Sequence, residues 1–352
     1  MSSVKLGIVG CGVIGQIHLK MAKQVAGCEV VAVADLRADM AQKTAADFKI
    51  PAWYDSGEKL LADKNVEAVV LAMPTFARTD LAPKTLQAGK HLLLEKPPAM
   101  NAGELENLQR LQGKLLVACC TSRHRFLASA AKVAEVVASG VLGSIRVVRV
   151  RAVTSGGKPP ANPPPVWRLS KKLNGGGIFS NWGCYDMDYL LGVTGWKLQP
   201  ETVLAQTWTI PAPFAYHAAP GSDGETHCVA LIRCAGGEAI TVERGEFMAS
   251  AADRAWQITG THGSLHMDLI PGTPNKVILD KAVSGQGVVT ETVWEGNEEW
   301  DDVHRGAMRD FVESLQSGRQ PATGLKEALV LQKISDAVFA SAASGAAVKI
   351  ER

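Results

Sequence analysis

The sequence lacks long apolar runs, and no stretch of it is long enough to span a bilayer. No basic-then-apolar leader precedes the first predicted strand. A basic surplus is also missing, because the formal net charge of the 352 residues is only +2. Without such a surplus there is little to neutralise phosphate groups. We therefore expect neither a membrane nor a nucleic acid as a partner.

Paired cysteines and metal-ligand spacings are missing too. The seven cysteines are scattered at positions 11, 28, 119, 120, 184, 228 and 234, with no CxxC pair and no histidine at metal-ligating spacing. An odd number of dispersed cysteines is typical of reduced packing thiols. The sequence thus predicts no metal site and, together with the missing leader, a cytoplasmic protein.

The overall composition is that of a folded globular protein. Hydrophobic residues make up 46% of the chain and charged residues 20%, which are ordinary values. Because single hydrophobic cores rarely grow beyond about 250–300 residues, a chain of 352 residues is expected to hold two domains.

The first distinctive motif is a glycine-rich loop. Residues 4–9 read as a buried strand, the loop GCGVIG follows, and apolar residues at helical spacing come next. Between a strand and a helix, the first glycine permits the turn, the second lets the backbone approach a pyrophosphate, and the third allows close packing. The alternative is a glycine-rich turn without a ligand. The predicted cofactor contacts in the loop are Gly10, Gly12, Val13, Ile14 and Gly15.

The second predicted strand ends in an acid, Asp35, about twenty residues beyond the loop. Its carboxylate is placed to accept a ribose hydroxyl and to repel a 2′-phosphate, which favours NAD. Arg37 is a signal in the other direction, because a guanidinium can pair with that phosphate, so NADP remains possible. A plain strand-end cap is the alternative role for Asp35.

Two further strand ends carry residues suited to a ligand site. The strand after residue 67 stops at Pro74-Thr75, which fits a loop along the nicotinamide ribose, and the next strand runs into Glu95-Lys96. Ligands of open parallel sheets bind beyond the carboxyl ends of the strands, so both ends are predicted to face the cofactor. A surface ion pair between Glu95 and Lys96 is the alternative.

The pattern of elements changes near residue 122. Before it, strands and helices alternate, which predicts a Rossmann dinucleotide-binding domain over residues 1–122. After it, long strand-like runs dominate and two helices close the chain, which predicts an α+β domain with a large, mostly antiparallel sheet over residues 123–352. The expected fold class is α/β, with this second domain at the C-terminal side.

These motifs together resemble one family. GIVGCGVIG, the acid at Asp35, AMPT at a strand end, AGKHLLLEKP, and Arg125-Phe126 followed by SGVLGSIRVV look like the Gfo/Idh/MocA oxidoreductases. The resemblance runs from the first strand to the C-terminus. It implies NAD(P)-dependent hydride transfer to or from a secondary hydroxyl of a sugar, cyclitol or glycoside, with Lys96 between the nicotinamide and that hydroxyl.

The chain departs from the family pattern in its catalytic motif. Many members carry DxGxHxxD after a glycine triplet, but here Asn181 replaces the Asp and Tyr185 replaces the His, while Gly183 and Asp188 match. Asparagine does not titrate, and an unperturbed tyrosine has a pKa near ~10. Either Tyr185 shares proton transfer with Lys96, as in the glucose–fructose oxidoreductase-like branch that the pair resembles, or Tyr185 only packs. The predicted catalytic residues are Lys96, Tyr185 and Asn181.

Further residues are predicted to line the substrate site. Trp167-Arg168 resembles a pair that precedes the glycine triplet in the family, and aromatic faces suit a pyranose ring. Arg123 either suits an acidic substrate or forms a salt bridge with Glu95 or Asp188. The predicted substrate contacts are Lys96, Arg123, Phe126, Trp167, Arg168, Asn181, Trp182 and Tyr185.

Other departures leave alternatives open. Arg78 stands where many members carry a histidine, which we treat as a minor change. Asp188 is expected to anchor its helix. Besides a net dehydrogenase, the sequence allows a redox-neutral glycoside hydrolase or epimerase with retained NAD, and a non-catalytic NAD-binding protein. The resemblance implies a homodimer or homotetramer that pairs through the C-terminal sheet.

Overall fold

The computed structural model describes residues 3–162, 164–272 and 274–351. They form two compact units. The first runs to Arg123 and also includes Asp301–Leu329, and the second holds His124–Trp300 and the residues from Val330 onward. The return of Asp301–Leu329 to the first unit has no counterpart in the sequence prediction. The predicted division into domains 1–122 and 123–352 remains a proposal.

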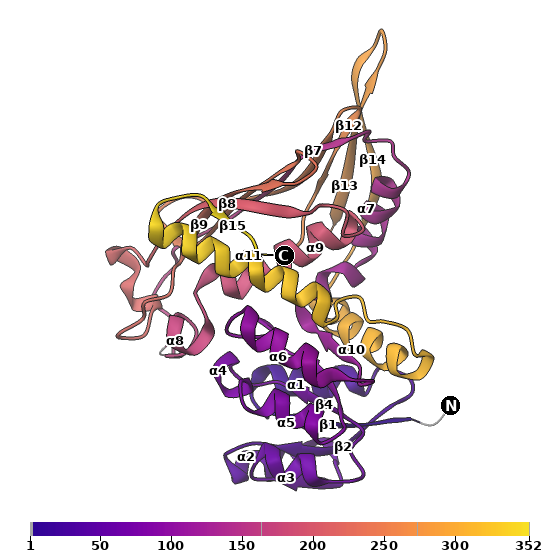
Figure 1. Cartoon of the computed structure of the whole chain (residues 1–352), viewed down its shortest axis with the longest axis vertical. Coiled ribbons are helices and arrows are strands. Elements are labelled where there is room, and N and C mark those ends of the chain that lie inside the picture. Colours follow the sequence, from indigo (N-terminus) through magenta and orange to yellow (C-terminus); the bar gives the residue numbers. More distant parts are fainter. Residues whose placement is uncertain (1–2, 163, 273, 352) are drawn as a thin grey trace. The chain divides into compact units, whose positions relative to one another are not determined.

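The first unit is built on a six-stranded sheet in the order β3-β2-β1-β4-β5-β6, and every neighbouring pair is parallel (Figure 1). β4 is buried along its whole length, as is typical of parallel strands covered on both faces. The strand order reverses between β1 and β4, which makes their carboxyl ends the switch point where ligands of such sheets bind. The predicted Rossmann-like sheet is confirmed. Its strands are β1 (Val4–Val9), β2 (Cys28–Ala34), β3 (Ala52–Tyr54), β4 (Ala68–Leu71), β5 (His91–Leu94) and β6 (Val117–Cys119).

Capping side chains set the start of two helices in this unit. Asn101 accepts a hydrogen bond from the Glu104 N–H at the start of α6, and Ser56 accepts one from the Lys59 N–H at the start of α3. The apolar core also includes Leu325 of α11. The helices of the unit are α1 (Val13–Ala22), α2 (Ala38–Phe48), α3 (Gly57–Ala62), α4 (Thr75–Arg78), α5 (Leu81–Gln87), α6 (Ala102–Gln112), most of α10 (Trp300–Ser317) and the start of α11 (Leu325–Ser344).

The second unit contains a nine-stranded sheet in the order β14-β13-β12-β11-β7-β10-β9-β8-β15 (Figure 1). All neighbouring pairs are antiparallel except β7 and β10, which run parallel. The prediction of a large, mostly antiparallel sheet is confirmed. The strands are β7 (Ile145–Ser155), β8 (Pro200–Trp208), β9 (His227–Cys234), β10 (Ala239–Met248), β11 (Asp253–Gly260), β12 (Gly263–Met267), β13 (Asn275–Val283), β14 (Gly287–Gly296) and β15 (Val348–Lys349).

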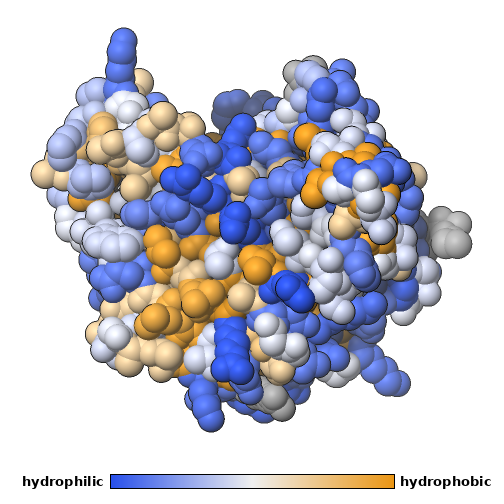
Figure 2. Space-filling view, turned by 90° about the horizontal axis from the view of Figure 1, so that it is seen from above, coloured by the Kyte–Doolittle hydropathy of each residue, from blue (hydrophilic) through white to orange (hydrophobic). Residues whose placement is uncertain are grey.

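The two faces of this sheet differ in burial. On one face of β8, Ala205 is buried and its N–H donates to Ser341 Oγ of α11 at 2.9 Å. On the other face, Leu204 and Leu231 are exposed. Figure 2 shows a patch of hydrophobic side chains on one face of the molecule. The other helical segments of the second unit are η1 (Cys120–Phe126, from His124), α7 (Ala128–Ala138), α8 (Lys171–Asn174), η2 (Phe179–Gly183), α9 (Cys184–Val193) and η3 (Ala212–His217). Among the described residues, no helix has the length and apolar character that a membrane span needs.

Candidate active site

The glycine loop between β1 and α1 is tight on its inner side and open on its outer side. Gly10 has a φ of 100°, and a Cβ there would lie 2.4 Å from the Ala72 carbonyl oxygen. A Cβ on Gly15 would lie 1.8 Å from the Gly10 carbonyl oxygen. By contrast, nothing lies within 4 Å of a Cβ on Gly12, and the adjacent Val13 is 82% exposed. This shape leaves room for a pyrophosphate at the N-terminus of α1.

Asp35 lies directly beside this loop. Its Oδ2 accepts a hydrogen bond from the Cys11 N–H at 2.9 Å, and its Oδ1 accepts one from the Arg37 N–H at 3.0 Å. Each carboxylate oxygen retains a lone pair, so the group can still accept a ribose hydroxyl. The structure therefore brings the predicted loop and the predicted ribose acceptor together.

The loops after β4 and β5 carry the other predicted cofactor contacts. Pro74 is the N-cap of α4, and Thr75 opens that helix with only 1% of its surface exposed. Lys96 is partly buried, and its N–H donates to the Oε2 of Glu95 at 3.0 Å. Glu95 is 3% exposed, so its carboxylate is directed into the protein and serves to hold the loop.

A buried ion-pair network surrounds Glu95. His18 Nε2 lies 2.8 Å from Glu95 Oε1, and Arg123 donates to the same oxygen. Burial on its own would raise the pKa of the Glu95 carboxyl, but Arg123, His18 and the Lys96 N–H together hold it well below its usual range. Of the two roles left open for Arg123, the structure supports the salt bridge with Glu95, so the argument for an acidic substrate loses its basis.

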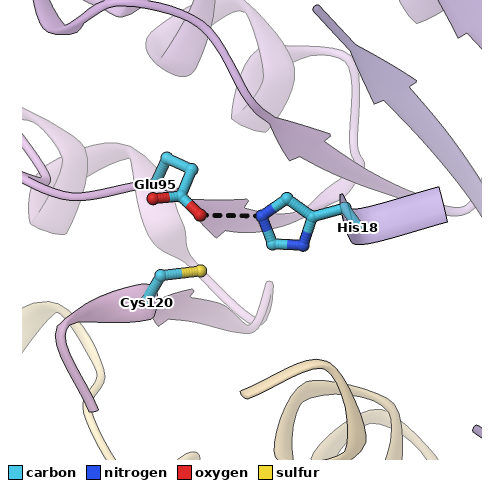
Figure 3. A group of neighbouring side chains, drawn as sticks. All are labelled: His18, Glu95 and Cys120. Carbon is cyan, nitrogen blue, oxygen red and sulfur yellow. Dashed lines mark hydrogen bonds and ion pairs between the residues drawn. The ribbon is translucent and has the colours of Figure 1, made fainter. Parts of the chain in front are cut away.

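His18, Glu95 and Cys120 also offer three atoms within 4.8 Å of one another, a set that could hold a metal ion (Figure 3). Two observations oppose a cation there. Burial, with the charge of Glu95, raises the pKa of Cys120 to about 12, so the thiol is protonated at neutral pH. The Glu95 oxygen already binds the guanidinium of Arg123, whose charge would repel a metal.

In the second unit, Asn181 and Arg168 are joined. Asn181 belongs to the π-helical segment η2 and is 2% exposed. Its Nδ2 donates to the Arg168 carbonyl oxygen at 3.1 Å, and its Oδ1 accepts from Asn174 Nδ2 at 3.2 Å. The Arg168 guanidinium donates to both carboxylate oxygens of Glu246. Asn181 therefore fixes the backbone of the segment that carries Arg168.

Tyr185 and Trp182 lie in an aromatic cluster. Their ring centroids are 5.6 Å apart, and the His124 ring is 4.9 Å from Tyr185. The Arg244 guanidinium lies 4.9 Å from the Trp182 ring centroid, so one face of Trp182 is occupied by a cation. Phe126 and Trp167 are both partly exposed.

The buried carboxylate of Asp186 supports this cluster, a role that was not predicted from the sequence. Asp186 accepts two hydrogen bonds from Arg244, at 2.7 and 2.9 Å, and one from Trp256 Nε1 at 2.9 Å. The sequence contains one signal for this pair. Alternation along β10 places Arg244 on the same face as the apolar residues Ile240 and Val242. A charge on a buried face needs a partner.

Asp188 pairs with Arg125 Nε at 2.7 Å and is fully buried, which agrees with the expected anchoring role. The structure thus gathers the predicted residues into two groups, one in each unit. The cofactor loops and Lys96 belong to the first group, and Arg168, Asn181, Trp182 and Tyr185 to the second. The predicted pairing of Lys96 with Tyr185 stays a prediction.

The chain is similar to known proteins in sequence and in fold. The family described as "Oxidoreductase family, NAD-binding Rossmann fold" matches residues 4–121, and the "GFO/IDH/MocA C-terminal domain" matches residues 130–266. Myo-inositol 2-dehydrogenase of Thermotoga maritima is 23% identical over 350 residues, which cover 99% of each chain. D-glucoside 3-dehydrogenase of Escherichia coli is 30% identical over 200 residues, which cover 55% of each chain.

Among solved structures, levoglucosan dehydrogenase in complex with NADH and levoglucosan superposes with a TM-score of 0.87. The match covers 100% of both chains at 19% sequence identity, which shows a common fold. Both family domains are therefore present, in the expected order and with the dinucleotide loop intact. The chain belongs to the Gfo/Idh/MocA family of NAD-binding oxidoreductases.

Proposed function

We propose that this oxidoreductase transfers a hydride between the nicotinamide and a secondary hydroxyl of a sugar, cyclitol or glycoside. The observation that carries the proposal is the position of Lys96, which follows β5 at the carboxyl edge of the parallel sheet, with its N–H bound to a buried carboxylate. Relatives named as dehydrogenases of inositol and of a glucoside support this substrate class.

The residues of the first unit fit a dinucleotide. The collisions that a Cβ would cause at Gly10 and Gly15, and the open surface at Gly12, describe a loop shaped for a phosphate group. Bound NAD supplies the acceptor for the hydride. In this proposal the loop binds the pyrophosphate and Asp35 binds the adenosine ribose.

We further propose a preference for NAD over NADP. The Asp35 carboxylate is fixed by two backbone N–H groups, so it does not move away from a 2′-phosphate without losing both hydrogen bonds. Exposed Arg37 is the group that would favour NADP. The ratio of kcat/KM for the two cofactors tests the preference, and Asp35→Ser is expected to reduce it about tenfold or more. A wild-type ratio in favour of NADP would reject this part of the proposal.

Proton transfer is assigned to Lys96, with Tyr185 as its partner. In this proposal Lys96 accepts the proton of the substrate hydroxyl as the hydride departs, and a phenolic hydroxyl can relay that proton. Asn181 has both ends of its amide bound within the protein, so we assign it a positioning role. Tyr185→Phe separates the two roles left open for the tyrosine, since a packing role predicts unchanged kcat.

The decisive experiment mixes the protein with NAD and a panel of cyclitols, sugars, anhydrosugars and glycosides and records NADH absorbance. We expect one class to react and Lys96→Ala to lower kcat by about 10²-fold or more with NAD still bound. Lys114→Ala, an exposed lysine of the same unit, is the control. If NAD binds and a glycoside is cleaved or epimerised without net NADH, a redox-neutral reaction replaces the proposal.

We propose that copies of the chain associate through the outer face of the nine-stranded sheet. Leu204 and Leu231 are paired across β8 and β9 and are 50% and 51% exposed. Light scattering should report a dimer or tetramer for the wild type and a smaller species for Leu231→Asp. Val166→Asp, at an exposed loop position of the same unit, should leave the size unchanged. A monomeric wild type would reject the association.

We also propose a cytoplasmic location. All seven cysteines lie in the described part of the chain and are outside disulfides, and five of them are buried. Free cysteines in this number are typical of a reducing compartment. Cell fractionation tests the location directly, and recovery of the protein outside the cytoplasm would reject it.

A further inference from the structure

A buried arginine, Arg78, joins the two loops that are predicted to flank the nicotinamide. It is the last residue of α4 and is 2% exposed. Its Nη1 donates to the carbonyl oxygen of Met73, beyond β4, and its Nη2 donates to that of Pro97, beyond β5. β4 and β5 are neighbours in the sheet, so one guanidinium connects the ends of two adjacent strands.

Glu95 holds the same loop from the other side. Its Oε2 accepts the Lys96 N–H at 3.0 Å, while its Oε1 binds His18 and Arg123. The backbone is therefore bound immediately before the Lys96 side chain and again one residue after it. Because both anchors are buried charged groups, moving the loop would break charge-assisted hydrogen bonds in the interior.

We propose that Arg78 and Glu95 are positioning residues that together fix the Lys96 backbone, and that the Arg78 charge also favours the proton-accepting form of the site. The second part, the effect of the Arg78 charge, rests on the proposed function, and the first part does not. Arg78 donates to the backbone of both loops, so in this proposal its effect on catalysis passes through Lys96.

Arg78 remains a cation under working conditions. Burial lowers its pKa to about 10, against the opposing influence of Glu95, so the guanidinium is protonated at neutral pH. The titratable groups that face it are Glu95 beyond β5, Cys119 and Cys120 at the end of β6, and Glu104 of α6. Arg123 is a second buried cation that pairs with the same Glu95. Two buried guanidinium groups thus face one buried carboxylate, the one that accepts the Lys96 N–H.

Two substitutions separate the hydrogen bonds of Arg78 from its charge. Arg78→Met keeps an apolar stem of similar length and loses both the charge and the connection between the loops. Arg78→Lys keeps the charge but, as a single ammonium, does not reproduce the planar fork that reaches two carbonyl groups. Arg110→Met is the matched control, because Arg110 lies on α6 of the same unit and its guanidinium donates to Asn107 on the same helix.

Two measurements test the proposal. The first is steady-state kinetics over a pH range, and the second is hydrogen exchange of the peptide that contains the Lys96 N–H. For Arg78→Met we expect kcat to fall about tenfold or more, because a small misplacement of a reacting group has effects of this size. We expect the acid limb of kcat/KM to move upward by about half a pH unit or more, because a nearby cation has been lost. Arg78→Lys should lower kcat with an unmoved acid limb, and Arg110→Met should change neither.

Hydrogen exchange keeps the first part of the proposal independent of activity. Without nicotinamide or substrate, the Lys96 N–H should exchange faster in Arg78→Met and in Arg78→Lys than in Arg110→Met. Equal exchange in all three overturns the positioning role, and an unmoved acid limb in Arg78→Met overturns the role of the charge. If the wild type binds NAD but oxidises no polyol, the proposed function fails, and exchange alone decides the positioning role. If Arg78→Met does not fold, Arg78→Gln, which also lacks the charge, replaces it in both measurements.

Discussion

Replacing Glu95 by glutamine removes one buried negative charge and leaves its cationic partner in the protein interior. Glu95, His18 and Arg123 are each no more than 3% exposed, so water does not compensate the loss. Removing one partner of such a buried pair costs about 3–5 kcal/mol of unfolding free energy. In a unit of 150–250 residues, each kcal/mol lowers Tm by about 2–4 °C, so the expected decrease is roughly 6–20 °C.

The deficit of Glu95→Gln should depend on pH in a defined direction. In the folded protein the pKa of Glu95 lies well below its usual value of 4.5, despite burial, because of Arg123 and His18. A carboxyl with a depressed folded pKa contributes its full stabilisation above the unfolded pKa, and the contribution is lost as pH falls toward the folded pKa. The variant should therefore be furthest below the wild type above about pH 5, and the gap should narrow under more acidic conditions.

Thermal unfolding followed by circular dichroism, from acidic to neutral pH, measures both effects. Glu58→Gln is the matched control, because Glu58 makes a surface ion pair with Lys84 at 2.9 Å and both side chains are about half exposed. Such pairs contribute about 0–1 kcal/mol. A decrease for Glu95→Gln that is no larger than for Glu58→Gln, or one that does not vary with pH, would refute the reasoning.

Three further predictions concern other parts of the molecule. Gly12→Ala should fold normally and bind NAD at least tenfold more weakly. Gly15→Ala should also lower Tm, because its Cβ would lie 1.8 Å from a carbonyl oxygen of the loop. Calorimetry measures Tm and fluorescence titration measures NAD binding, which separates the two variants. Burial and the nearby Arg123 lower the pKa of His304 to about 3. His304 should therefore show no NMR titration between pH 5 and 8, and a midpoint near 6.5 would contradict its burial. Asp186→Asn, which leaves buried Arg244 without an anion, should cost about 3–5 kcal/mol in denaturant unfolding, and a loss below 1 kcal/mol would contradict the buried pair.

Much of the first unit follows from local sequence patterns. The run of leucines before Glu95 predicts β5, because strands buried on both faces of a parallel sheet are continuous apolar segments. The glycine loop was assigned correctly to a strand–helix junction, since only glycine tolerates the φ of 100° at Gly10. Strand-like runs predicted the large, mostly antiparallel sheet of the second unit, but not that β7 and β10 pair in parallel.

Side-chain partners far apart in the sequence could not be predicted in the same way. Arg123 had two candidate acids, and the structure assigns Glu95 to it and Asp188 to Arg125. Nothing in the local sequence separates these options, because both arginines lie within the same short segment, η1. The role of Arg78 was missed for a related reason. A charged residue is ordinarily exposed to solvent, and only the tertiary fold shows that this one is buried.

The first unit includes a segment from late in the chain, and this affects how the unit folds during synthesis. Leu325 and Ala328 belong to its apolar core, and the Cys119 N–H donates to the Thr323 carbonyl oxygen at 2.9 Å. A ribosome delivers these residues only after the whole nine-stranded sheet except its last short strand has been synthesised. During translation the nascent dinucleotide-binding half therefore exposes apolar surface that a chaperone could recognise.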